Sequence, residues 1–419
     1  MTDDRDVLRS ISWRDVFPWV LIFRTFGVSF QLRVLLLAIA GVILVDVGWW
    51  GAAQVFLPQE ERPQAEVVHP PLFAKRAVEQ AAEGRLGTIL LIADPIQEVW
   101  VHATRPYRTF FSVHNSIRSA AYRAFCALWA TAVWSVFGGA ICRIAALALT
   151  RDERCGLKAA LKFGLYRFLS FFTAPLFPLL GVLAFAIPAI LLGLLSYFGD
   201  VGLLISGILY FVAAIFGVMT AALLIPLLFG WPLMWGAIAT EASDAFDALS
   251  RSYAYVTQRP LHFAFYSAIS LAVGVLGLFV ISVIVVVSLG MTDWAFSLGA
   301  GDERLAEIHV AVEDALYFPQ AIAGDGPQLT QGARIIHFWR GLVARIIDGY
   351  VYGFFFIAAT AIYLLLRYDV DQAELDEVAL EDEVRFPPPT FATEEGSTAA
   401  EPESKAPGNF ESTPPPPAD

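Results

Sequence analysis

Six long apolar segments alternate with more polar stretches along this chain. Each holds about 20 residues or more, the length an α-helix needs to cross a hydrocarbon core of about 30 Å. Because lipid offers the backbone no hydrogen bonds, helices are the structure expected for such runs. The pattern predicts an all-α fold, a polytopic helical membrane bundle of about six transmembrane helices. The segments span approximately residues 34–56, 124–149, 168–198, 201–229, 263–289 and 346–366.

The third segment differs from the others because it contains three prolines, Pro175, Pro178 and Pro188. Proline removes a backbone donor and kinks or breaks the interior of a helix. Two alternatives stay open: one kinked helix that crosses once, or a broken and partly re-entrant segment. A double crossing here would invert the sidedness of every later segment.

Short interfacial helices and two long loops accompany the spans. The N-terminal segment, residues 1–33, mixes aromatic residues with arginines over 13–31, which is typical of an amphipathic helix in the membrane interface. The membrane domain covers 34–368, with outer loops at 57–120 and 290–345. Within these loops, apolar residues at helical spacing predict small helices over residues 72–82 and 304–316.

Composition supports a membrane location, and the net negative charge of the chain comes from its C-terminal segment. The chain has 419 residues, 57% hydrophobic and 16% charged, whereas soluble domains are nearer one quarter charged. Residues 369–419 carry 14 acidic and 2 basic residues, and the rest of the chain carries 26 of each. The net charge of −12 is therefore that of the tail. Its richness in Glu, Pro, Ser and Thr predicts a disordered region, suited to tethering protein partners.

Basic residues predict the orientation, since short cytoplasmic loops are enriched in Lys and Arg. The loop after the second segment is the most basic of the chain. Placing it in the cytoplasm puts both termini of this multi-pass protein there too. The basic residues are Arg143, Arg151, Arg154, Lys158, Lys162 and Arg167.

Two stretches beginning at Gly138 and Met234 resemble each other as a weak internal repeat. Each holds the end of one span, a polar stretch, a short amphipathic helix and the start of the next span. The polar faces of the two short helices have opposite charge, so we hypothesise that they lie side by side with these charges paired. The alternative is that each face meets water and lipid headgroups. The charges are Arg154, Lys158 and Lys162 on one helix, and Glu241, Asp244 and Asp247 on the other.

Asp46 and Arg143 are the candidate polar residues within the spans. A carboxylate inside a membrane helix costs several kcal/mol and is a functional candidate by default. Asp46 lies three residues before Trp49, near the outer interface, so a polar contact with a neighbouring helix or the outer cap is a stronger interpretation than a proton- or ion-relay role. Arg143 follows small residues that permit close helix packing, and near the inner interface it could snorkel. Anchoring the orientation is the stronger interpretation of Arg143, and binding of an anionic headgroup is the alternative.

Asp244, Asp247 and Arg251 form a local cluster, in which Asp247 and Arg251 are an i, i+4 pair in the favoured order. Paired carboxylates can serve acid–base chemistry or bind a cation, but a helix-surface ion-pair network is the stronger interpretation. The six histidines are scattered, and the sequence has no hydrolase elbow, P-loop or dinucleotide fingerprint. We therefore expect no enzyme activity, cofactor, metal or nucleic-acid partner. Of the three cysteines, Cys126 and Cys142 lie about 24 Å apart along one helix, too far for a disulfide.

Three pieces of sequence carry a resemblance: "VFGGAICRIAALAL", "WPLMWGAIATEASDAFDALSRSYAYVTQRP" and "IYLLLRYDVDQAELDEV". They resemble a family of uncharacterised bacterial multi-pass membrane proteins. Glu241 with the following "ALSRSY" is also distantly similar to the membrane domain fused to some glycerophosphodiester phosphodiesterases. The resemblance implies a helical membrane body, and it transfers no catalytic residue.

These observations favour a non-catalytic structural or interaction protein of the cytoplasmic membrane, with the lipid bilayer and tail-bound proteins as its partners. A transporter or lipid-handling protein is the alternative, supported by the repeat, the proline-rich third segment and Asp46. A membrane-embedded enzyme is the third. A polar cavity that reaches Asp46 or Arg143 would favour transport, and a dry bundle would disfavour it.

Overall fold

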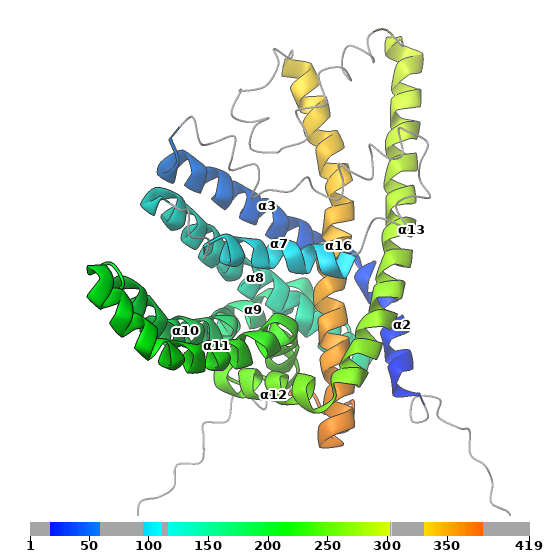
Figure 1. Ribbon diagram of the computed structural model, residues 1–419. Helices are drawn as coiled ribbons and strands as arrows, with labels where there is room; N and C mark the ends of the chain where they lie inside the picture. Colours follow the sequence, from blue (N-terminus) through cyan, green and yellow to red (C-terminus); the bar gives the residue numbers. More distant parts are fainter. Residues whose placement is uncertain (1–16, 59–94, 111–115, 302, 304–330, 380–419) are drawn as a thin grey trace, which may run out of the picture. The chain divides into compact units, whose positions relative to one another are not determined.

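The computed structural model describes residues 17–58, 95–110, 116–301, 303 and 331–379, and this described part is built from helices without a strand (Figure 1). Six of its helices are long and apolar enough to span a membrane. The predicted polytopic helical bundle is therefore confirmed. The six are α3 (Leu32–Phe56), α8 (Ile117–Thr150), α10 (Phe168–Leu195), α11 (Gly199–Glu241), α13 (Pro260–Ala300) and α16 (Gln331–Asp371).

Three of these helices are much longer than their apolar segments. With 43 residues, α11 is about 64 Å long at about 1.5 Å per residue, and α13 and α16 have 41 residues each. Helix α13 runs into the expected outer loop at 290–345 from one side, and α16 begins inside it from the other. The sequence made both helices too short at this loop, because the hydropathy of the chain falls before each helix ends. Helix α13 continues to Gly301, whose positive φ of 83° is the left-handed region that glycine adopts most easily.

The third apolar segment is one helix, α10, with all three prolines inside it. This selects the single, continuous alternative left open by the sequence. Helix α10 packs along α11, and the two form a hairpin whose tip exposes Tyr197 and Phe198. Large apolar side chains are exposed around both helices, as expected of a surface that faces lipid.

Helix α16 is the centre of the bundle. It packs against α3, α8, α11 and α13, and its most apolar stretch is entirely buried. Its aromatic residues lock the neighbours in place: Tyr352 stacks on Trp134 with ring centroids 4.7 Å apart, and Phe356 stacks on Trp235 at 5.3 Å. Aromatic contacts of this kind contribute about 0.5–1.5 kcal/mol beyond simple burial.

Shorter helices pack around this core. The predicted interfacial helix appears as η1 (Pro18–Val20) and α2 (Leu21–Ser29), with Pro18 in the first turn. Helices α9 (Leu157–Tyr166) and α12 (Ala245–Gln258) are the two short helices of the repeat. Helix α7 (Pro95–Phe110) lies in the expected loop 57–120 and packs on α8 and α16. The expected helices at 72–82 and 304–316 lie outside the described residues.

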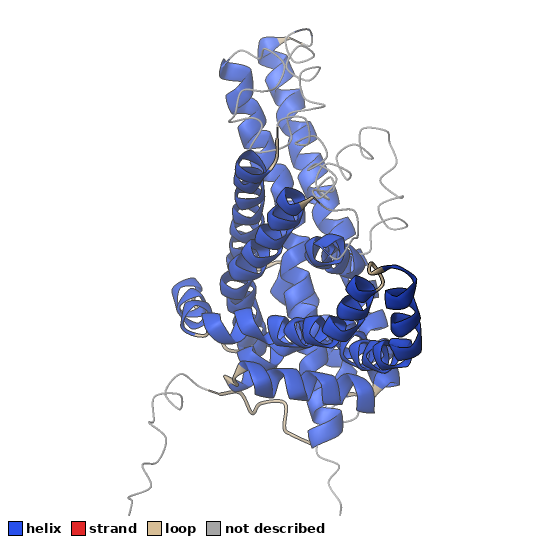
Figure 2. Cartoon of the chain, turned by 60° about the vertical axis from the view of Figure 1, so that its left-hand side comes forward, coloured by secondary structure: helices blue, strands red, loops and turns tan. Residues whose placement is uncertain are grey.

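The compact unit of the chain continues to Ala379, beyond the expected start of the tail at residue 369. Helix α16 extends to Asp371, and the eight residues 372–379 then fold back on the bundle (Figure 2). We call residues 372–379 the docked segment. The end of the bundle that it covers is called the tail-side end, and it also holds the C-terminal ends of α8 and α11.

Candidate functional site

Asp46 forms a buried ion pair between α3 and α16. Its Oδ2 lies 2.8 Å from Nη1 of Arg345, and the two side chains are 13% and 4% exposed. At this distance the attraction is about 6 kcal/mol for an effective dielectric constant of about 20. The carboxylate thus makes a polar contact with a neighbouring helix, which was one of the two interpretations offered by the sequence.

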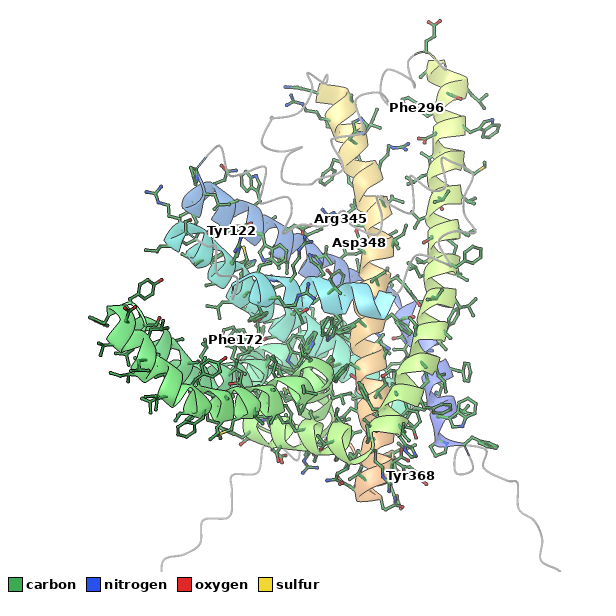
Figure 3. All side chains as sticks on the ribbon, in the orientation of Figure 1. Tyr122, Phe172, Phe296, Arg345, Asp348 and Tyr368 are labelled. Atoms are coloured by element: carbon green, nitrogen blue, oxygen red, sulfur yellow. The ribbon has the colours of Figure 1, made fainter. Side chains whose placement is uncertain are left out.

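The sequence analysis missed Arg345 and Asp348, the α16 partners of this region. Both lie on the same side of α16 and are buried, Arg345 at 3% and Asp348 at 0% exposure (Figure 3). Arg345 was missed because the apolar segment was started at residue 346, which left Arg345 in a loop. Asp348 lies inside that segment and was not singled out there. The i, i+3 spacing of an arginine and an aspartate beside an aromatic run was the available signal.

The space beside Asp46 is too small for a solute. A cavity of about 10 Å³ lies between Asp46, Trp49, His102 and Tyr352, which is about the volume that one water molecule requires. His102 is hydrogen-bonded to the hydroxyl of Tyr352, and Trp49 packs edge-on against the imidazole at 5.3 Å. This geometry fits a structural ion pair better than a pathway for a hydrophilic substrate.

Arg143 lies at the tail-side end, but its side chain is buried in the protein and does not extend into solvent, so it does not snorkel. It is 3% exposed, and its guanidinium lies 4.6 Å from the ring centre of Phe163. Nη1 donates to the carbonyl of Ala239 at 2.9 Å, and Nη2 donates to that of Ala379 at 2.6 Å. One arginine therefore satisfies a terminal carbonyl of α11 and holds the end of the docked segment.

Two further arginines hold the docked segment. Arg151 donates from Nε to the carbonyl of Asp376 at 3.0 Å, and Arg367 donates from Nη1 to that of Glu377 at 2.7 Å. The backbone N–H of Ala379 donates to the carbonyl of Thr240 at 2.9 Å. The polypeptide that leads into the acidic tail is thus fixed to the ends of α8, α11 and α16.

Glu241 is the centre of an ion-pair network at the tail-side end. Its carboxylate lies 2.8 Å from Arg251 Nη1 and 3.0 Å from Arg367 Nε, and it accepts a hydrogen bond of 2.6 Å from the hydroxyl of Tyr363. Burial by itself would lower the pKa of Arg251, but Glu241 and Asp247 outweigh this and raise it. The network joins α11, α12 and α16, so it is more than the helix-surface pair expected from the sequence.

Asp244 and Asp247 have roles within α12. Asp244 is the N-cap, and its side chain accepts a hydrogen bond of 2.8 Å from the backbone N–H of Asp247. Asp247 pairs with Nε of Arg251 at 3.1 Å, which confirms the expected i, i+4 pair. Both carboxylates therefore stabilise α12 and its contact with the bundle.

The proposed pairing of charges between α9 and α12 is wrong. The acidic residues of the second helix bind Arg251, Arg367 and the N-terminus of α12 instead. Among the described residues, Arg154, Lys158 and Lys162 are exposed and make no ion pair. A sequence comparison could not reveal this, because the competing partner Arg367 comes from α16, outside the repeat.

The largest cavity that we describe is apolar. It has a volume of about 450 Å³ and is walled by α7, α8, α10, α11 and α16. Its hydroxyls are already bonded: Thr104 donates to the carbonyl of Trp100, and Tyr107 is bonded to Thr131. Burial raises the pKa of Tyr107 to about 12, so this hydroxyl stays protonated at neutral pH. Water would find few partners here, whereas a hydrocarbon would be well accommodated. The cavity is partly open, and Arg108 marks its rim as an exposed cation.

Among the residues that the structure describes, no group of three or more His, Cys, Asp and Glu side chains is placed so that it could hold a metal ion. The two buried thiols, Cys126 and Cys142, are free. Comparison of the chain with protein-family models, with curated proteins and with solved structures finds no match.

Proposed function

We propose that this integral membrane protein is a non-catalytic interaction protein that presents its acidic C-terminal tail at a fixed position on the membrane. The observation that carries the proposal is the docked segment, held by Arg143, Arg151 and Arg367. A tail that only had to be present would need no such attachment. The attachment sets the point from which residues 380–419 extend, and so determines which neighbours they can reach.

The charged groups of the membrane body support a non-catalytic role. Asp46, Arg143 and Glu241 are all engaged in contacts that join helices. The space beside Asp46 has room for about one water molecule. A substrate that needed the carboxylate of Asp46 or Glu241, or the guanidinium of Arg143, would have to displace one of these structural contacts, which weighs against transport of a solute along them.

We further propose that the tail-side end faces the cytoplasm of the bacterial inner membrane. Arg24 donates to the carbonyl of Leu149 at 2.8 Å, so the N-terminal helix α2 lies at the same end as the docked segment. The exposed bases Arg154, Lys158 and Lys162 lie on or beside α9, at this end also. Positive charge at the cytoplasmic surface is the general rule for membrane proteins, and it supports cytoplasmic termini.

The test compares three forms of the protein that are purified in mild detergent. The full-length chain, a chain ending at Ala379 and a chain ending at Tyr368 are captured by an N-terminal tag, and the bound proteins are identified. We expect partners with the full-length chain alone. The form that ends at Ala379 keeps the docked segment, so any loss of partners in it is due to the tail itself.

The importance of position requires a further comparison. Residues 372–419 fused to an unrelated single-span helix keep the sequence of the tail but remove the three arginines that hold it. We expect this fusion to recover the partners at least tenfold less efficiently than the full-length chain. Equal recovery would leave the tail as a simple binding peptide, and recovery of the same proteins by all forms would refute the proposal.

A further inference from the structure

Arg108 lines the apolar cavity, and further arginines lie near it along α7 and at the start of α8. Residues 99–151 contain arginines and no acidic residue. Four of these arginines lie where α7 ends and α8 begins, at the end of α8 far from the docked segment. Among the described residues, three of them, Arg105, Arg108 and Arg118, form no ion pair. The four are Arg105, Arg108, Arg118 and Arg123.

The contact between the two helices places this charge beside the cavity. Nη1 of Arg123 donates to the carbonyl of Thr109 at 3.0 Å, which fixes the start of α8 against the last turn of α7. Arg105 and Arg108 are three residues apart on α7 and so are neighbours on its surface. Arg108 itself lines the cavity and is exposed, so its guanidinium lies at the boundary between the apolar space and the outside.

The interior of the cavity has the character of a hydrocarbon site. Val182 and Leu179 line it from α10, and Leu224 and Leu227 line it from α11. These are the two helices whose outer surfaces expose apolar side chains to lipid. Trp231 also lines the cavity, is 9% exposed and has an indole N–H without a hydrogen-bond partner. The cavity is therefore walled in part by the two helices whose opposite surfaces face lipid.

We propose that this cavity binds one acyl chain of an anionic phospholipid whose phosphate is held by Arg108. The apolar side chains of the wall would contact the acyl chain of the lipid. The arginines that form no ion pair would attract its negatively charged headgroup. A guanidinium binds phosphate oxygens through two parallel hydrogen bonds, which gives arginine an advantage over lysine at such a site. The volume, about 450 Å³, falls in the range of ligand sites in proteins, about 300–1,000 Å³.

The site is independent of the proposed role of the tail. It lies among α7, α8, α10, α11 and α16, whereas the docked segment is held at the tail-side end. A bound lipid would occupy the cavity in every form of the protein, with or without its tail. Failure of one proposal therefore does not imply failure of the other.

The experiment uses full-length protein that has been stripped of lipid in detergent. Phosphatidylglycerol and phosphatidylcholine with identical chains are added separately, and retained lipid is counted by native mass spectrometry. We expect one tightly held phosphatidylglycerol per chain, with an affinity at least tenfold above that for phosphatidylcholine. Arg108→Gln should lower the affinity for phosphatidylglycerol about tenfold, and Arg108→Lys by less. Arg154→Gln, the matched loss of an exposed arginine at the other end, should change nothing.

A second variant tests the position of the chain. Thr104 lines the cavity, and its hydroxyl bonds only within α7, so Thr104→Phe adds bulk there without removing a contact between helices. We expect it to lower binding of both phospholipids. Phosphatidylglycerol with brominated chains should quench tryptophan fluorescence in the native protein and quench it less in this variant, because cavity tryptophans lie within contact range.

Three outcomes would overturn the proposal. Equal affinity for the two phospholipids would show that Arg108 does not select a negatively charged headgroup. Equal loss of binding in Arg108→Gln and Arg154→Gln would show that binding depends on the total positive charge of the protein and not on Arg108. Preferential retention of a free fatty acid with the same chain would replace the phospholipid as occupant. Size-exclusion profiles matching the native protein confirm that each variant is folded.

Discussion

The ion pair between Asp46 and Arg345 allows a quantitative test of how the bundle is held together. Asp46→Asn removes the negative charge and keeps the shape of the side chain. Arg345 is 3% exposed, so its buried guanidinium would then lose the carboxylate that lies 2.8 Å from it. Breaking a buried pair in this way typically costs about 3–5 kcal/mol.

The magnitude distinguishes this pair from an ordinary contact between membrane helices. The 2.8 Å separation corresponds to about 6 kcal/mol of attraction at an effective dielectric constant of about 20, part of which is offset by the loss of hydration. Hydrogen bonds between membrane helices average only about 0.6 kcal/mol in double-mutant cycles. We therefore expect a coupling energy of about 2–4 kcal/mol between Asp46 and Arg345.

The assay is unfolding in mixed detergent micelles, followed as SDS replaces the mild detergent. The four members of the cycle are the native protein, Asp46→Asn, Arg345→Gln and the double variant. The cycle removes the effects of other groups near Arg345 and leaves the energy of the pair. As a reference, the same cycle on Asp247 and Arg251, which are 45% and 36% exposed, should give less than about 1 kcal/mol.

A coupling energy below about 1 kcal/mol for Asp46 and Arg345 would refute the reasoning. It would mean that the two charges are hydrated in the membrane, or that they do not meet. A double variant more stable than either single variant would be compatible with it, because it no longer leaves one member of the pair charged without the other.

Three other substitutions test the packing and the tail-side end. Gly138→Ala should lower the free energy of unfolding by about 1–3 kcal/mol, because its added methyl group would lie 2.8 Å from a tryptophan ring. The control Gly51→Ala meets nothing within 4 Å and should not destabilise the protein. Both variants are measured by the same SDS titration. Arg143→Met should raise the rate of proteolysis within the docked segment about tenfold, since it removes two charge-assisted hydrogen bonds to carbonyl groups; an unchanged rate would show that the segment is held by other contacts. Glu241→Gln should cost about 2 kcal/mol, and Asp247→Asn less than about 1 kcal/mol, because Glu241 is 13% exposed and Asp247 is 45% exposed; the reverse order in thermal stability would contradict the assigned network.

The apolar pattern predicted the number and the kind of spans well, because the length of a hydrophobic run reflects the thickness of the bilayer. It placed the helix ends poorly. Helix α16 begins at Gln331, although its most hydrophobic part was expected to start at residue 346. Hydropathy reports where a helix contacts lipid or core, whereas the hydrogen bonds of the backbone continue through more polar residues until a residue such as Gly301 ends them.

The polar contacts were harder to predict, because their partners come from distant parts of the chain. Asp247 and Arg251 are four residues apart, and the sequence identified them as a pair. Glu241 also binds Arg367, 126 residues later, and no local pattern indicates that contact. The burial of Arg143 was missed for a related reason: it depends on how closely α11 and the docked segment approach, which is a property of tertiary packing.

The central position of α16 has a consequence for biosynthesis. The helix that fills the middle of the bundle is the last of the six spanning helices to leave the ribosome. Until it arrives, α3, α8, α10 and α11 can pack on one another, but α13 lacks the spanning helix against which it packs, and Asp46 lies in the membrane before Arg345 has been made. The first five spans must therefore stay in the bilayer with lipid or an insertion factor where α16 will pack. Assembly of this protein is thus completed by its last span, and a chain interrupted before residue 331 lacks the helix that joins α13 to the other spans.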